Sequence, residues 1–110
     1  MSAHDLDRTL AALGDPCRRR VVDLLRERPR RAGELAEAAK IAFPLMSRHL
    51  KKLRESGLVE EDRDEFDSRV RIYRLKPKPM ADLKLWLEET EALWSRQLAA
   101  FKAHVQKSRK

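Results

Sequence analysis

The segment IAFPLMSRHLKKLRESGLVEEDR, residues 41–63, decides the fold of this chain. Met46, Leu50 and Leu53 recur at steps of four and three residues, which predicts a helix with one buried apolar stripe. Gly57 comes directly after this helical pattern, where glycine readily takes the left-handed conformation that ends a helix. Two apolar residues follow the glycine, so the segment predicts a helix, a tight turn and a strand.

The opposite face of this predicted helix carries positive charge. At 100° per residue, Arg48 and Lys51 fall opposite the apolar stripe, together with Pro44. A basic helix followed by a β-hairpin suits a recognition helix in the DNA major groove and its wing. The expected DNA contacts are Phe43, Pro44, Ser47, Arg48, His49, Lys51 and Lys52 in the helix, and Arg69 and Arg71 in the hairpin. For His49 the pattern also allows a partly buried, hydrogen-bonded side chain.

The predicted wing consists of two strands, at residues 58–63 and 69–75, joined by a short loop. The loop carries Asp64, Glu65 and Asp67, and these carboxylates would repel DNA phosphates. On sequence alone, the contribution of the wing to DNA binding therefore stays open.

Three further helices are predicted upstream of the recognition helix. A short opening helix covers residues 6–13. Asp15 then suits an N-cap and Pro16 the first helical position, and this second helix should end before Pro29. A third, short helix around residues 35–39 would cross the DNA backbone and support the recognition helix.

A long final helix is predicted from residue 80 to about 105, after Pro77 and Pro79 interrupt the chain. Both tryptophans of the protein, Trp86 and Trp94, fall on its apolar stripe. So small a domain can cover only part of this stripe, and the remainder needs a partner. The alternative is a helix that folds back entirely onto its own domain.

Length and composition limit the classes of function. A chain of 110 residues predicts a single domain, 1–110, with one modest core. Its 39% charged residues and net charge of +7 favour polyanionic partners, and most of the positive excess lies within residues 15–57. The sequence has no apolar run of membrane-spanning length and no secretory pattern at its start, so we expect a cytoplasmic protein. One cysteine, Cys17, fits that reducing compartment.

Three ordered blocks resemble the ArsR-type family of winged helix-turn-helix repressors. The blocks are LGDPCRRRV at residues 13–21, GELAE at residues 33–37 and SRHLKKLRESGLV at residues 47–59. The resemblance covers roughly residues 10–75, and the matching order of the blocks makes a chance similarity improbable.

The resemblance implies an α+β, mainly α fold: a winged helix-turn-helix with N- and C-terminal dimerisation helices. The helical DNA-binding core then covers residues 15–57, the β-hairpin wing 58–75 and the C-terminal dimerisation helix 80–105. Relatives pair through their first and last helices, which implies a homodimer that binds a palindromic double-stranded DNA operator. The implied dimerisation residues are Leu6 and Leu10 in the first helix, and Leu83, Trp86, Leu87, Trp94, Leu98 and Phe101 in the last.

The chain departs from its relatives where the recognition helix begins. Relatives often have Ser-Gln-Pro-Ala-Val, whereas this chain has Ala-Phe-Pro-Leu-Met at residues 42–46. Ala42 cannot cap the helix as serine would. Phe43 replaces an amide that could read adenine, and can instead touch a thymine methyl or the core. Arg31 likewise stands where a capping Ser or Thr is common, which leaves that capping box incomplete.

The sequence predicts no metal site and no cofactor. Metal-responsive relatives use a Cys-x-Cys cluster on the third helix or Asp and His pairs on the last, and this chain has neither. A site that subunits share through His4 and His104 is the remaining metal alternative. Cys17 is a candidate redox sensor, because a helix terminus and neighbouring arginines favour its thiolate; a packed core residue is the other interpretation. The effector stays unknown.

We expect no enzymatic activity, because the sequence offers no glycine-rich phosphate loop and no nucleophile with a plausible base. The favoured function is a sequence-specific DNA-binding transcriptional regulator, a dimeric repressor. The alternatives are a metal- or redox-responsive regulator and a protein-interaction module. In that module the Trp-bearing helix binds another protein, and the basic helix is merely solvated.

Overall fold

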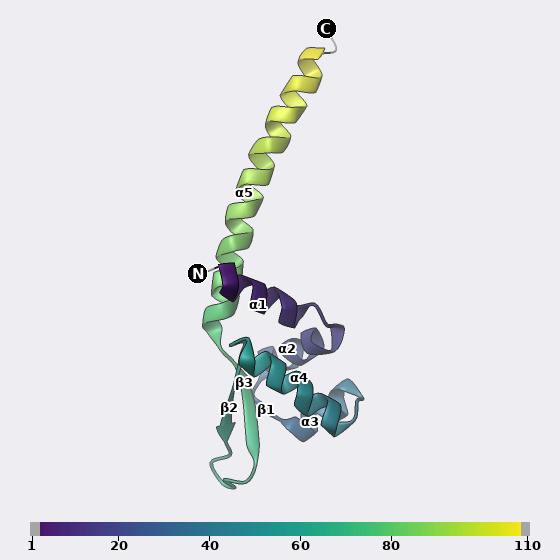
Figure 1. Ribbon diagram of the computed structural model, residues 1–110, viewed down its shortest axis with the longest axis vertical. Coiled ribbons are helices and arrows are strands. Elements are labelled where there is room, and N and C mark those ends of the chain that lie inside the picture. The colour runs from purple at the N-terminus through teal and green to yellow at the C-terminus, as the bar shows by residue number, and fades with distance from the viewer. Residues whose placement is uncertain (1–2, 109–110) are drawn as a thin grey trace.

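The computed structural model describes residues 3–108, which form five helices and three short strands (Figure 1). In chain order the elements are α1 (Ala3–Leu13), α2 (Pro16–Glu27), β1 (Arg30–Arg31), α3 (Ala32–Ala39), α4 (Phe43–Glu55), β2 (Val59–Arg63), β3 (Arg71–Leu75) and α5 (Pro77–Ser108). Helices α1 to α4 and the sheet form a compact body, from which α5 projects. The part of α5 after residue 83 forms the shaft of the molecule. The mainly helical winged fold predicted from the sequence is confirmed.

The ends of α2 and α4 follow the predicted local chemistry. Asp15 caps α2: its Oδ1 accepts the backbone N–H groups of Cys17 at 2.8 Å and Arg18 at 3.1 Å. Helix α4 has no side-chain cap at Ala42, as predicted. After α4, Gly57 has a φ of +79°, a left-handed conformation that a side chain would strain.

The three strands form an antiparallel sheet in the order β1-β3-β2. Strands β2 and β3 make the predicted hairpin, with Val59 opposite Leu75 and Arg63 opposite Arg71. Strand β1 was not predicted, because two residues carry no alternation pattern and only their pairing with β3 defines them. This pairing attaches the wing to the start of α3.

One apolar core lies between α2, α3, α4 and the hairpin. Its largest fully buried side chains are Val21, Leu35, Met46, Leu50, Leu53, Leu58 and Val59. The three from α4 are those whose spacing predicted the buried stripe, so the orientation of α4 in the fold is fixed by its own sequence.

Helix α5 begins at Pro77, earlier than the predicted residue 80. Prolines fit in a first helical turn because the N–H groups there have no acceptor within the helix, so Pro77 and Pro79 start the helix instead of preceding it. Helix α1 packs against its first part, where Leu83 is buried. Beyond that contact α5 extends away and gives the molecule a length of 73 Å, so the folded-back alternative is wrong. Within residues 3–108, no helix is both long and apolar enough to cross a membrane.

Candidate nucleic-acid interface

The outer face of α4 presents exposed positive charge. Because Met46, Leu50 and Leu53 are at most 1% exposed on one side, Arg48 and Lys51 point outward and are exposed. Neither forms an ion pair with any residue of the described range 3–108. Both cations are therefore available to a polyanion, and the arginine can make a bidentate contact with guanine.

A hollow of about 370 Å³ lies between the start of α4 and the wing. Phe43 and Ser47 line it from α4, and Arg69 and Arg71 line it from the wing. Four of the residues predicted to contact DNA therefore share one concave surface. Arg31 also lines the hollow, although its sequence position marked it only as a poor helix cap. The pairing of β1 with β3, which the sequence pattern does not contain, brings Arg31 to this hollow.

Two wing arginines are held by neighbouring carboxylates. Nε of Arg71 lies 3.1 Å from a carboxylate oxygen of Glu61, and Nε of Arg69 lies 3.2 Å from one of Asp67. Both arginines are exposed, so water screens these pairs and each contributes little to stability. A DNA phosphate can replace either carboxylate as the partner of its arginine.

The acidic wing tip is less repulsive to DNA than the sequence suggested, because Asp64 is turned inward. Asp64 is 8% exposed, and its Oδ1 accepts the backbone N–H of Phe66 at 2.7 Å. Arg31 donates to its Oδ2 at 3.0 Å, although the two residues are far apart in the sequence. The Phe66 hydrogen bond is the main cause of a lowered pKa for Asp64, and Arg31 adds to it. The carboxylate of Asp64 therefore organises the wing, and its charge is largely compensated.

Acidification should loosen the wing at Asp64. Because folding lowers the pKa of Asp64, its ionised form stabilises the wing above the ordinary carboxyl pKa of about 3.9, and that stability is lost as the pH falls through the lowered folded-state value. NMR can follow the Phe66 amide signal, which should shift with a midpoint below that of a free carboxyl group. In Asp64→Asn this transition should be absent; an identical titration in the variant would contradict the role of Asp64.

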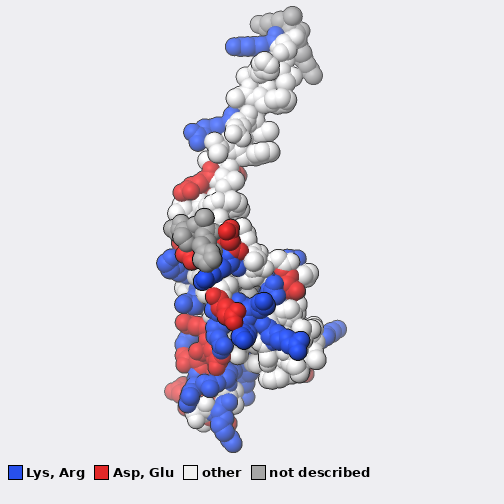
Figure 2. Space-filling view, in the orientation of Figure 1, with Lys and Arg blue, Asp and Glu red and all other residues white. Residues whose placement is uncertain are grey.

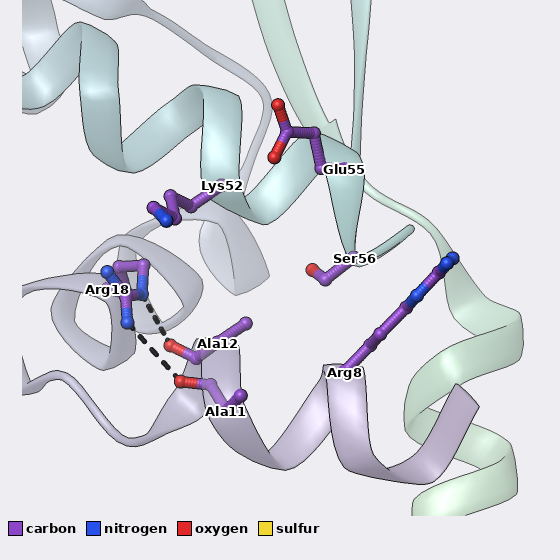
Figure 3. Close-up of a pocket in the computed structure, with 7 residues that line it drawn as sticks. All are labelled: Arg8, Ala11, Ala12, Arg18, Lys52, Glu55 and Ser56. Atoms are coloured by element: carbon purple, nitrogen blue, oxygen red, sulfur yellow. Dashed lines mark hydrogen bonds between the residues drawn. The ribbon is translucent and has the colours of Figure 1, made fainter. Parts of the chain in front are cut away.

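Two predicted DNA contacts lie off the outer face of α4. His49 is half-buried and faces α2, where its Nδ1 lies 3.4 Å from Nη1 of Arg18, as expected for the alternative of a partly buried, hydrogen-bonded side chain. Lys52 is exposed but lines a different hollow, of about 600 Å³, with Arg8 and Arg18 (Figure 3). The remaining predicted residue of α4, Pro44, is exposed beside Arg48.

Cys17 does not have the reactive environment that its arginine neighbours suggested. Burial is the main cause of a raised pKa for its thiol, and the negative charge of Asp15 raises it further. Arg18 acts in the opposite direction but does not reverse the shift. The expectation of a favoured thiolate is therefore wrong in this structure, which argues against Cys17 as a redox sensor.

The predicted dimerisation residues fall into two groups. Leu83 is 8% exposed and Leu6 is half-buried, so both already pack against their own chain. The others remain exposed: Leu10, Trp86, Leu87, Trp94, Leu98 and Phe101. On the face that Figure 2 shows, charged side chains are sparser along the outer part of α5 than on the body. The alternative metal site predicted from the sequence consists of His4 and His104. His104 is exposed, while the side chain of His4 lies outside the described residues.

Comparison with known proteins places these features in a family. A family model described as bacterial regulatory protein, arsR family, matches residues 15–61. The HTH-type transcriptional regulator Rv2034 of Mycobacterium tuberculosis is 35% identical over 95 residues, which cover 86% of this chain and 83% of that protein. The transcriptional repressor SdpR of Bacillus subtilis is 33% identical over 58 residues, which cover 53% of this chain and 64% of that protein.

Solved structures share the whole architecture. An ArsR-like transcriptional regulator from Rhodococcus sp. RHA1 matches with a TM-score of 0.81 and 27% identity, over 97% of this chain and 98% of that one. A homodimeric winged helix-turn-helix DNA-binding domain, Mb0332 from Mycobacterium bovis, matches with a TM-score of 0.65 and 25% identity, over 81% and 80% of the two chains. The chain therefore belongs to the ArsR family of winged helix-turn-helix transcriptional regulators.

Proposed function

We propose that this regulator is a homodimeric repressor that binds a palindromic DNA operator through α4. The observation that carries the proposal is the outward row of Arg48 and Lys51, which stands on a fully buried stripe of the same helix and lacks ion pairs within residues 3–108. A helix held so rigidly can place its cations in a major groove without rearrangement. The hollow lined by Phe43, Ser47 and the wing arginines lies beside it for the flanking phosphates.

The exposed apolar stripe of α5 supports the dimer. The stripe that begins with buried Leu83 continues outward through Leu87, Trp94 and Phe101, each seven residues from the next. Such a repeat keeps one helix face toward a partner, and the M. bovis domain with the same fold is named homodimeric. A twofold dimer would present its two α4 helices to half-sites about one DNA turn, roughly 34 Å, apart.

Repression follows from occupancy of a promoter. A dimer bound across about one turn of DNA excludes polymerase from the same surface, and one relative of this chain is named a transcriptional repressor. Because the proposed target is promoter DNA, we place its action in the cytoplasm.

Salt dependence tests DNA binding against the alternative of a protein-interaction module. Three candidate phosphate contacts per subunit, Lys51, Arg69 and Arg71, give about six phosphate-facing charges per dimer. The affinity for a fragment selected from genomic DNA should then fall by about 10³-fold or more between 50 and 200 mM salt. Fluorescence anisotropy measures this slope, with a scrambled duplex of equal length as control. An affinity that hardly changes with salt, or equal affinity for both duplexes, would contradict specific operator binding.

A further inference from the structure

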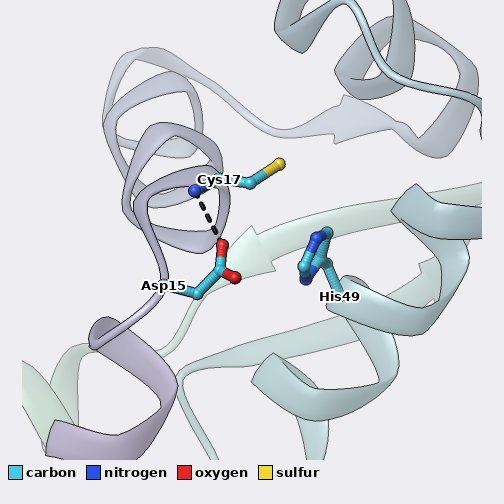
Figure 4. Close-up of side chains that lie close together, drawn as sticks. All are labelled: Asp15, Cys17 and His49. Atoms are coloured by element: carbon cyan, nitrogen blue, oxygen red, sulfur yellow. Dashed lines mark hydrogen bonds between the residues drawn. The ribbon is translucent and has the colours of Figure 1, made fainter.

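Three side chains that commonly ligate metals converge between α2 and α4, away from the outer row of α4. Figure 4 shows His49 of α4 facing Asp15 and Cys17 at the start of α2. One carboxylate oxygen, the Cys17 sulfur and one imidazole nitrogen all lie within 4.8 Å of one another. All three residues are half-buried, so an ion there would be partly desolvated and still reachable from water. No sequence pattern indicates this cluster, because its members lie at the start of α2 and in α4, which are separate helices.

The donor set has a definite chemical preference. A thiolate, an imidazole and a carboxylate together favour a borderline divalent cation such as Zn²⁺, rather than the hard Mg²⁺ or Ca²⁺. In a tetrahedral zinc site, bond lengths of about 2.0–2.3 Å place the donor atoms roughly 3.3–3.6 Å apart. Because the three donor atoms already lie within 4.8 Å of one another, side-chain movements of roughly an ångström would bring them to that spacing. Water can occupy the fourth position.

The surroundings hold the ligands in place. Oδ1 of Asp15 is fixed by the backbone N–H groups of Cys17 and Arg18, while its Oδ2 accepts no hydrogen bond within the described range 3–108 and is available to an ion. Arg18 is the competing group, because its Nη1 lies 3.4 Å from Nδ1 of His49. Its Nε also donates to the carbonyl oxygen of Ala12 at 2.7 Å, which anchors the guanidinium to the end of α1. Among the described residues, the contact with Nη1 of Arg18 is the one that an ion bound at Nδ1 of His49 has to displace.

We propose that Asp15, Cys17 and His49 bind one Zn²⁺-type cation per chain and thereby link the start of α2 to the recognition helix. The ion brings two positive charges and displaces the thiol proton of Cys17 into solvent, so the site gains one positive charge. Added positive charge next to α4 and a more rigid α4 both favour a polyanionic partner. We therefore expect the bound ion to tighten operator binding; this second expectation rests on the proposed function.

Cobalt(II) is the probe for the site, because its spectrum reports the ligands. The full-length protein, purified under reducing conditions and freed of metal, should bind one equivalent per chain. Binding should produce a thiolate-to-cobalt charge-transfer band in the near ultraviolet and the intense visible bands of four-coordinate cobalt, and Zn²⁺ should abolish both by displacement. Cys17→Ser should lose the charge-transfer band. His49→Gln and Asp15→Asn should each weaken binding by at least about tenfold.

Controls separate loss of ligation from loss of fold. Asp15→Asn keeps an N-capping side chain, so its circular dichroism should match that of the wild type. His104→Gln removes an exposed histidine of α5 and should leave cobalt binding unchanged. The site is overturned if stoichiometric cobalt gives no charge-transfer band, or if His49→Gln binds cobalt as tightly as His104→Gln does.

Operator affinity measured with and without Zn²⁺ tests the regulatory consequence separately. A several-fold tighter complex in the wild type, absent in Cys17→Ser, supports it, and by reciprocity operator DNA must then tighten metal binding by the same factor. If cobalt binding is intact but the operator affinity is the same with and without the ion, the link to regulation is overturned. The proposed metal site itself is then retained. Intact cobalt binding without any DNA binding would overturn the proposed function instead.

Discussion

Replacing Trp94 by aspartate is expected to dissociate the dimer and, as a consequence, to weaken operator binding. Trp94 lies on the exposed stripe of α5, in the part of the helix that its own chain does not cover. In a twofold dimer the substitution places two carboxylates in an apolar interface, and each loses several kcal/mol of solvation. A total of at least about 4 kcal/mol raises the dissociation constant of the dimer about a thousandfold.

Sedimentation velocity over a concentration series measures this change directly. Leu85→Asp is the matched control, because Leu85 is similarly exposed on the same helix but points away from the stripe, about 200° from Leu83. This variant should remain dimeric and bind the operator normally. The folded body should be intact in both variants, since neither position contributes to the core cluster. If Trp94→Asp sediments as the wild type does, the shaft of α5 is not the dimer interface.

Local chemistry explains why much of the fold could be predicted. Met46, Leu50 and Leu53 have the spacing of a helical face, so the burial of that face and the exposure of Arg48 followed from the sequence. Asp15 and Gly57 ended up in the cap positions that their side-chain chemistry favours. Each of these features depends on neighbours within a few residues.

Other features of the fold and of the candidate site depend on how far apart the helices and strands lie in space. A local sequence pattern does not contain this distance. Leu83 and Trp94 share one stripe of α5. Leu83 is covered and Trp94 is exposed because the body extends along only the first part of α5. His49 lies on the flank of α4, where the helical period does not distinguish a DNA groove from the neighbouring α2. Asp64 is compensated by Arg31 because β1 pairs with β3, a contact between residues far apart in the chain. The candidate metal site was missed for the same reason.

Arg48→Ala is expected to abolish specific recognition while the protein stays folded and dimeric. The guanidinium is exposed and forms no ion pair within residues 3–108, so its removal leaves no buried group unsatisfied, and alanine favours a helix. A bidentate contact to a base contributes about 1–3 kcal/mol, and a twofold dimer loses it at both half-sites. The operator affinity should therefore fall by about 30-fold to 10⁴-fold, whereas binding to a scrambled duplex falls much less.

Two comparisons show whether the loss comes from base recognition or from charge alone. Arg48→Lys keeps the charge but not the planar fork, so it should retain non-specific binding and lose most of the preference for the operator. Arg96→Ala removes one charge from an exposed arginine of α5 that has no ion pair within residues 3–108, and should leave both affinities close to the wild-type values. Footprinting of the selected fragment locates the effect, because protection should vanish at both half-sites in Arg48→Ala. A footprint and an affinity equal to those of Arg96→Ala would mean that Arg48 does not read the operator, and the groove-facing side of α4 would have to be reassigned.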